Sequence, residues 1–320
     1  MFESSTETHS NPLDTFFPAV AFCEESQLVQ LRMLAKRIRM ASLPQLSGLM
    51  SGSHESKQKG RGLDLDQLRI YQPGDDIRSI DWRVTARTQK PHTRIYKEER
   101  ERPIMIFCDQ RSPMFFGSQR SFKSAVAAQT MALIAWAAID HGDKVGAYIL
   151  SDQTEMDFRA KQRPQHVFHI LQELVRFNQT LLHSEHKLKR SLGDSLQHIN
   201  RSLTPGTTLF LISDFYDLAD SDKEALFKLK RHNHVVALQV FDPLEQEVPP
   251  IGSYGVSDGE QEAVLNITRG NIQQFEQAQK MWQQGINNQF KQLGINHHMI
   301  NAGEIPYSAI KIALEQRGKL

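Results

Sequence analysis

The chain has 320 residues, of which 39% are hydrophobic and 23% charged, and its formal net charge is +1. A chain of this length and composition can bury a core, and its balanced charge gives no overall attraction to nucleic acid or to an anionic membrane. The longest apolar runs, such as Val126–Ile139, are shorter than the roughly 18–20 residues of a membrane span. We therefore expect a cytoplasmic protein with no nucleic-acid partner and no membrane span.

The N-terminal part of the chain divides into a polar tail, a helix and a loop. Residues 1–23 are polar and acidic, which predicts a disordered tail and not a signal peptide. From Glu24 an amphipathic helix is predicted, whose apolar face lies opposite arginines and lysines. A loop rich in Gly, Ser and Lys follows over residues 47–62. The apolar face of the helix consists of Leu28, Leu31, Leu34, Ala35 and Ile38.

A charged segment follows this loop. Between Arg61 and Arg102, eight arginines are interleaved with eight carboxylates, whereas a nucleic-acid surface leaves basic charge in excess. The stretch 71–87 has no histidine, cysteine or lysine to serve as base or nucleophile. Its part "RSIDWRVTAR" alternates apolar and charged residues, which predicts an extended segment. We expect residues 24–102 to form the N-terminal helix and this extended β segment, packed on the main domain through Ile80 and Trp82.

The remainder of the chain, residues 103–320, alternates strands with helices. "PIMIFCD" and "TTLFLISDF" are continuous apolar runs that reach an aspartate, as expected for parallel strands buried on both faces. Alternation of this kind predicts an α/β domain with a mostly parallel central sheet and helices on both faces. A hairpin turning at Ser257–Gly259 and further helices complete the C-terminal part. Cys23 and Cys108 lie far apart, so a disulfide framework is not expected.

One long stretch resembles a known family. "GRGLDLDQLRIYQPGDDIRSIDWRVTAR" followed by "YKEERERPIMIFCDQRSPMFFGS" is similar to the bacterial domain-of-unknown-function family 58, over about Gly60–Asp242. That family has a von Willebrand factor A-like, Rossmann-like domain and is linked to MoxR-type AAA+ ATPases. The resemblance implies a non-enzymatic binding adaptor in protein assembly or maturation, with such an ATPase and a client protein as partners. Its signature residues, structural or partner-binding, are Arg69, Tyr71, Gly74, Asp75, Asp76, Arg78, Asp81, Trp82 and Arg87.

The resemblance also implies a site at the strand ends. In A domains a metal-ion-dependent adhesion site has Asp-x-Ser-x-Ser after the first strand, a threonine on a second loop and an aspartate after a later strand. Here the first motif falls on Asp109, Arg111 and Pro113, so both hydroxyls are lost and a fixed cation competes with the metal. Ser112 lies one residue away from each of the two hydroxyl positions of the motif. Ser213 and Asp214 match the later loop, and Ser195 is the nearest candidate for the threonine.

Two interpretations of this degenerate site are open. In the first, Asp109 pairs with Arg111 or with backbone N–H groups, and no metal binds. In the second, the guanidinium replaces the metal and holds a partner's carboxylate bidentately. We expect no catalytic residue, no metal and no cofactor, with Mg²⁺ disfavoured. The alternative function is a metal-dependent hydrolase that uses Asp109 and Asp214.

Overall fold

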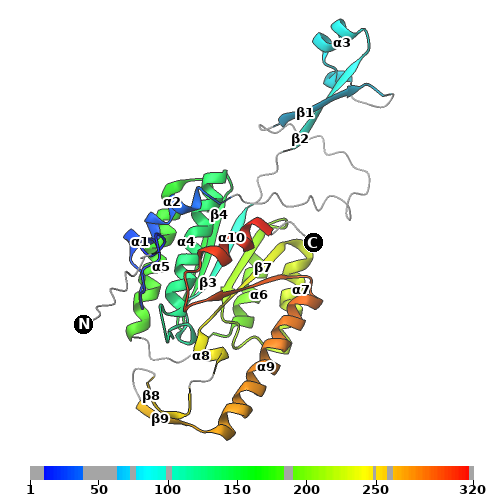
Figure 1. The fold of residues 1–320 in the computed structure, drawn as a ribbon. Coiled ribbons are helices and arrows are strands. Elements are labelled where there is room, and N and C mark those ends of the chain that lie inside the picture. The colour runs from blue at the N-terminus through cyan, green and yellow to red at the C-terminus, as the bar shows by residue number, and fades with distance from the viewer. Residues whose placement is uncertain are drawn as a thin grey trace, which may run out of the picture. The chain divides into compact units, whose positions relative to one another are not determined.

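The computed structural model describes residues 11–38, 63–72, 77–98, 103–183, 190–247, 250–257 and 262–316. The chain divides into two compact units. The larger unit consists of residues 1–43 and 102–320, and the smaller unit of residues 44–101 (Figure 1). None of the helices in the described part of the chain has the length and apolar character of a membrane span.

The larger unit is built around a six-stranded sheet in the order β10-β7-β6-β3-β4-β5. Neighbouring strands are parallel except at one edge, where β5 runs antiparallel to β4. Counted within this sheet, the order is that of a doubly wound fold, which confirms the predicted α/β architecture. The strands are β3 (Ile104–Asp109), β4 (Val145–Leu150), β5 (Glu155–Lys161), β6 (Thr208–Ser213), β7 (His234–Phe241) and β10 (Asn296–Asn301).

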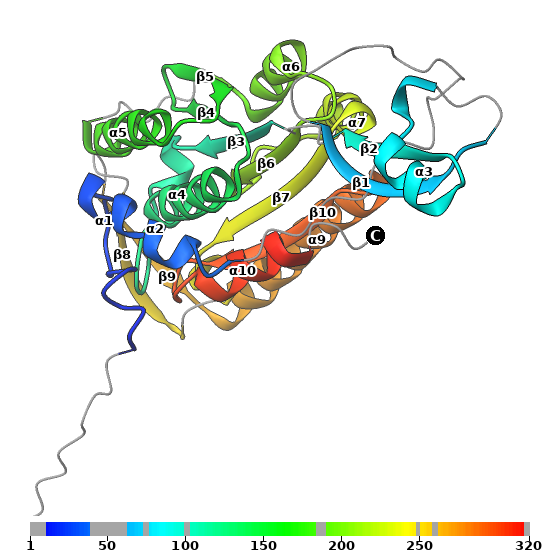
Figure 2. The ribbon, with the colours of Figure 1, turned by 90° about the horizontal axis from the view of Figure 1, so that it is seen from above.

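Helices cover both faces of this sheet and form a separate hydrophobic core on each. Figure 2 shows α4 on one side of the strands and α6 and α7 on the other. The first core includes side chains of α4 (Lys123–His141), α5 (Pro164–Thr180), α10 (Tyr307–Gln316), α1 (Glu25–Gln30) and α2 (Arg32–Ala35). The second includes side chains of α6 (Leu192–Ser202), α7 (Lys223–His232) and α9 (Arg269–Gln292).

Helix α4 is buried on all sides. Every residue from Lys123 to Ile139 is buried, because the helix lies between the sheet and the N-terminal helices α1 and α2. Its many alanines allow this close approach on several faces at once. A helix that is apolar all round is typical of such a position in a large core.

The N-terminal segment corrects one prediction. Residues 11–23 are not a disordered tail, because Phe17 and Cys23 are fully buried in the first core. Arg120 fixes the segment through Asp14 at 2.7 Å and through the carbonyl of Phe17. Both cysteines of the chain are free and buried, and burial raises the pKa of Cys23 to about 12. Residues 1–10 and the predicted loop 47–62 lie outside the described part of the chain.

The C-terminal part contains the predicted hairpin and helices, and also a short helix that the sequence analysis did not predict. The short helix α8 (Pro243–Gln246) comes directly after β7. The predicted hairpin is present as β8 (Gly252–Ser257) paired with β9 (Glu262–Ile267). Single 3-10 turns occur at residues 112–114, 181–183 and 220–222.

The smaller unit contains a two-stranded antiparallel sheet of β1 (Leu63–Ile70) and β2 (His92–Glu98). The predicted extended structure of "RSIDWRVTAR" is wrong, because this stretch forms a 3-10 turn at residues 77–79 and the helix α3 (Trp82–Thr88). Asp81 caps α3 by accepting hydrogen bonds from the N–H groups of Arg83 and Val84. Trp82 is 65% exposed. Packing of this unit on the larger one stays a prediction.

Candidate functional site

The candidate site lies at the carboxyl edge of the six-stranded sheet. Asp109 is the last residue of β3, and Ser213 and Asp214 are the last residue of β6 and the residue after it. The three side chains are buried. Parallel strands bring their carboxyl ends to the same edge, which is where open α/β sheets bind ligands.

Arg111 occupies the centre of this edge and uses all five N–H groups of its guanidinium. Nε and Nη2 donate to the two carboxylate oxygens of Asp109 at 2.9 and 2.7 Å. Nη1 and Nη2 donate to the two oxygens of Asp217 at 2.6 and 2.9 Å, and Nη1 also donates to the carbonyl of Arg190 at 3.4 Å. The side chain is 1% exposed, so the guanidinium is a buried, fully bonded cation.

This geometry combines the two interpretations of the degenerate site. Asp109 pairs with Arg111, as the first interpretation expected. The guanidinium also holds a second carboxylate bidentately, as in the second interpretation, but that carboxylate is the chain's own Asp217. Burial alone would lower the pKa of Arg111, but Asp109 and Asp217 outweigh burial and raise it. The arginine therefore stays charged and has no free donor for a partner.

The residues at this place do not fit Mg²⁺. The ion needs several oxygen ligands near 2.1 Å. Both oxygens of Asp109 already accept hydrogen bonds from Arg111, and Oδ2 also accepts one from Ser213 Oγ at 2.7 Å. Ser112 turns away, because its N–H and its hydroxyl both donate to Asp152 Oδ1. Ser195 lies in α6 and donates to the backbone carbonyl of Ser191.

A second buried cation, Lys123, lies at the same edge. It is at the start of α4, and its side chain is 2% exposed. Nζ donates to Asp214 Oδ2 at 2.8 Å and to Glu245 Oε1 at 2.5 Å. Burial alone would lower the pKa of Lys123, but Asp214 and Glu245 outweigh burial and raise it. Asp109 and Asp214 are therefore each paired with a different cation.

Four carboxylates of this edge were missed in the sequence: Asp152, Asp217, Asp242 and Glu245. A simple signal could have found them, because each lies within a few residues of the carboxyl end of β4, β6 or β7. Asp242 accepts from the N–H of Ser118 at 2.8 Å and also from its hydroxyl. No pattern in the sequence marked Lys123, because it is one lysine in a long helix. It meets its carboxylate partners only when α4 is packed on the sheet.

Two of the signature residues in the smaller unit make structural contacts. Asp81 caps α3, and the N–H of Tyr71 donates to the carbonyl of Pro91 at 2.8 Å. Arg78 and Arg87 are exposed, and Arg69 is half-buried. Gly74, Asp75 and Asp76 lie outside the described residues.

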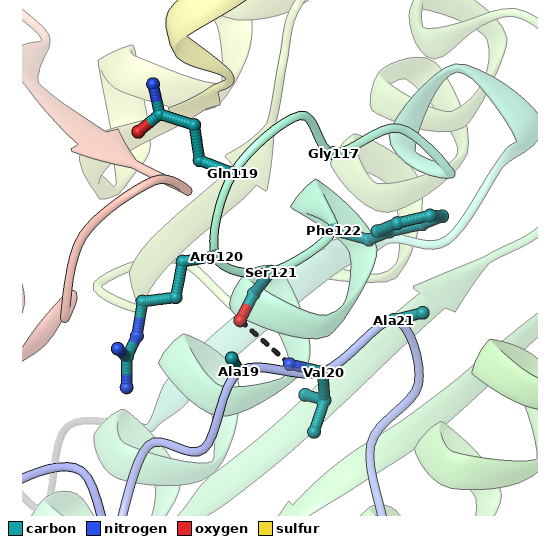
Figure 3. A pocket seen from close by; sticks show the side chains of 8 residues that line it. All are labelled: Ala19, Val20, Ala21, Gly117, Gln119, Arg120, Ser121 and Phe122. Atoms are coloured by element: carbon teal, nitrogen blue, oxygen red, sulfur yellow. Dashed lines mark hydrogen bonds between the residues drawn. The ribbon is translucent and has the colours of Figure 1, made fainter.

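A small hollow of the larger unit lies beside the N-terminal segment. It has a volume of about 110 Å³ and lies between residues 19–21 and 117–122 (Figure 3). A hydrogen bond from the N–H of Val20 to Ser121 Oγ crosses it at 3.2 Å. Gly117 has no room for a side chain, because a Cβ there would lie 2.6 Å from the ring of Phe122. This volume corresponds to a few water molecules. The hollow therefore belongs to the packing of the N-terminal segment and is not a site for an organic ligand.

Fold and site together define a doubly wound α/β domain in which a buried arginine lies between two carboxylates at the carboxyl edge of the sheet. The family model described as "Protein of unknown function DUF58" matches residues 67–284, and the chain belongs to this family. Uncharacterized proteins of Mycobacterium bovis and Mycobacterium tuberculosis are 26% identical to it over 239 residues, which cover 75% of this chain and 74% of each relative.

Two solved structures are also similar to the chain. The conserved hypothetical protein BatB from Bacteroides thetaiotaomicron aligns with a TM-score of 0.41 and 15% identity, over 68% of this chain and 100% of that chain. Proximal thread matrix protein 1 of the mussel byssus aligns with a TM-score of 0.33 and 10% identity, over 68% of this chain and 46% of that chain.

Proposed function

We propose that the chain is a non-enzymatic protein-binding adaptor that works with a MoxR-type AAA+ ATPase in protein assembly or maturation. The ATPase and a client protein are the partners that the family resemblance implies. The proposal places the protein in the cytoplasm, as the sequence led us to expect, where such an ATPase has access to ATP.

The observation that carries the non-enzymatic part is the pairing of the strand-end carboxylates. A hydrolase with Asp109 and Asp214 would need their oxygens for a metal or for a reacting group. Arg111 holds Asp109 and Lys123 holds Asp214, and both cations are buried. Breaking either pair would leave a buried charge without its partner, which costs several kcal/mol. The arrangement favours a rigid binding surface over a reactive centre.

The adaptor function is tested by capture from the native cell extract. The purified chain serves as bait in the presence of a non-hydrolysable ATP analogue, and bound proteins are identified by mass spectrometry. We expect a MoxR-type ATPase, and we expect Arg87→Glu on the exposed face of α3 to weaken its capture. Arg176→Glu, at an arginine that is also exposed, is the matched control. Capture of no such ATPase by the unmodified chain would refute the proposal.

The hydrolase alternative has its own test. The chain is incubated with Mg²⁺ or Mn²⁺ and generic phosphate esters. We expect no turnover above that of a heat-denatured sample. Turnover that Asp109→Asn abolishes would overturn the adaptor function in favour of the enzyme.

A further inference from the structure

Three exposed apolar side chains belong to the segments that the buried Lys123 contacts at the carboxyl edge. They are Phe116, Tyr216 and Leu244, with exposed fractions of 41%, 72% and 38%. The carbonyl of Phe116 accepts the N–H of Lys123 at 2.8 Å. Leu244 and Tyr216 are close in sequence to the two carboxylates that hold the lysine. Leu244 precedes Glu245 in α8, and Tyr216 follows two residues after Asp214. In Figure 1, α8 lies where β7 ends. One buried lysine thus fixes the three loops that carry the exposed residues.

Tyr216 is held in its exposed position by the backbone. Phe215 has a φ of 58°, a left-handed conformation that is rare for a large side chain. Its own ring is buried against Phe290, with ring centroids 5.1 Å apart. The N–H of Tyr216 donates to Asp214 Oδ1 at 3.1 Å, and its ring lies 6.3 Å from that of Trp282 in α9. Strain of this kind is typical of sites that bind or react, and here it presents an aromatic ring to solvent.

The same edge has a surplus of negative charge. Among the described residues, the hydrogen-bonded group contains six carboxylates opposed by Arg111 and Lys123. Arg190, whose carbonyl accepts from Arg111, is itself paired with Glu155 at 2.7 Å. Asp217 and Glu245 are partly exposed, at 25% and 33% of their side chains. The six carboxylates are Asp109, Asp152, Asp214, Asp217, Asp242 and Glu245. An adhesion site with a bound metal attracts a carboxylate of its partner, whereas this edge attracts a cation.

We propose that the carboxyl edge of the sheet is a docking surface for a partner segment that presents lysine or arginine beside an apolar side chain. The inference rests on the proposed adaptor function and names the chemistry that the adaptor recognises. The apolar anchor packs on Phe116, Tyr216 and Leu244, which removes exposed apolar area from water. The cation gains from the surplus carboxylates and from the face of the Tyr216 ring.

The test uses the full chain and two fluorescent peptides of equal length. Both peptides have a central Trp-Leu pair, flanked by lysines in one and by glutamates in the other. We expect the lysine peptide to bind at least about tenfold more tightly by fluorescence anisotropy, and to weaken as NaCl rises from about 0.05 to 0.5 M because salt screens exposed charges. Equal binding of the two peptides, or tighter binding of the glutamate peptide, would overturn the inference.

Matched variants locate the binding. Tyr216→Ala should weaken the lysine peptide about tenfold, as for the aromatic anchor of an interface, and Glu245→Gln should weaken it several-fold. Phe227→Ala and Glu224→Gln are the controls, because both change exposed side chains of α7 and should leave the affinity unchanged. Tyr216 is exposed, so its removal does not open the core. An affinity that Tyr216→Ala leaves unchanged would refute the location.

The docking surface and the ATPase partner can be refuted independently of each other. If the unmodified chain captures the ATPase but shows no preference for the lysine peptide, the charge inference is wrong and the adaptor function stands. If the peptide preference and its loss in Tyr216→Ala are found without any ATPase capture, the docking surface stands and the ATPase partner is wrong.

Discussion

Replacement of Arg111 by methionine tests the central interaction of the site. Methionine keeps an unbranched side chain and removes the charge and all five donors. Asp109, whose side chain is 1% exposed, then loses its cation and keeps only the hydrogen bonds from Ser213 Oγ and from the backbone N–H of residue 111. Removal of one partner of a buried ion pair costs about 3–5 kcal/mol. We expect the free energy of unfolding of the larger unit to fall by this amount near neutral pH.

The stability difference between variant and wild type should also depend on pH in a defined direction. Burial alone would raise the pKa of Asp217, but Arg111 outweighs burial and lowers it. The unfolded chain then binds more protons than the folded chain, so this stability is present above the unfolded-state pKa of about 3.9 and is lost as the pH falls further. Without the arginine, burial raises the pKa of Asp217, and the folded variant takes up a proton there. The stability difference between variant and wild type should therefore shrink between about pH 7 and pH 4.

The assay must report on the larger unit alone. The chain has three tryptophans, and Trp136 of α4 is fully buried in the first core. In a background with Trp82→Phe and Trp282→Phe, urea unfolding followed by Trp136 fluorescence gives the stability of this unit. Arg176→Met is the control, because that arginine is 70% exposed and its removal should change stability by less than about 0.5 kcal/mol. A loss below about 1 kcal/mol for Arg111→Met, or a difference that grows in acid, would refute the reasoning.

Three further predictions concern the same edge and the smaller unit. Mg²⁺ at 1 mM should not raise the melting temperature of the unmodified chain, although Mg²⁺ binding with a dissociation constant near 10 µM would stabilise it by about 2.7 kcal/mol. The double variant Arg111→Ser with Pro113→Ser should show such a rise with Mg²⁺ in calorimetry. If it shows none, the edge carboxylates do not converge on one point. Lys123→Met should cost about 3 kcal/mol in urea unfolding, because Asp214 is left buried and unpaired; a cost under about 1 kcal/mol would show that Asp214 is readily solvated. Asp81→Ala should remove about 1 kcal/mol from the smaller unit through loss of the α3 cap, and hydrogen exchange in α3 that is unchanged would contradict the capping role.

The order of elements in the larger unit could be predicted from the sequence because each element carries its own local pattern. The apolar runs of β3 and β6 mark strands that are buried on both faces, and the alternation of strands with helices defines a parallel sheet. The predicted extended structure of "RSIDWRVTAR" is wrong because alternation of apolar and charged residues over so few positions also fits a 3-10 turn followed by a short capped helix. Asp81 at the N-cap was the signal for the helix.

The sequence by itself determined that Asp109 and Arg111 stand two residues apart after a buried strand, and hence that a cation competes with a metal there. Only the tertiary structure decided which carboxylates that cation holds, because Asp217 comes from the loop after β6, 106 residues further along the chain. The same is true of Lys123, whose partners Asp214 and Glu245 come from two different strand ends. Pairing at the edge of a sheet depends on strand order, and strand order is set by packing across the whole core and not by any local pattern.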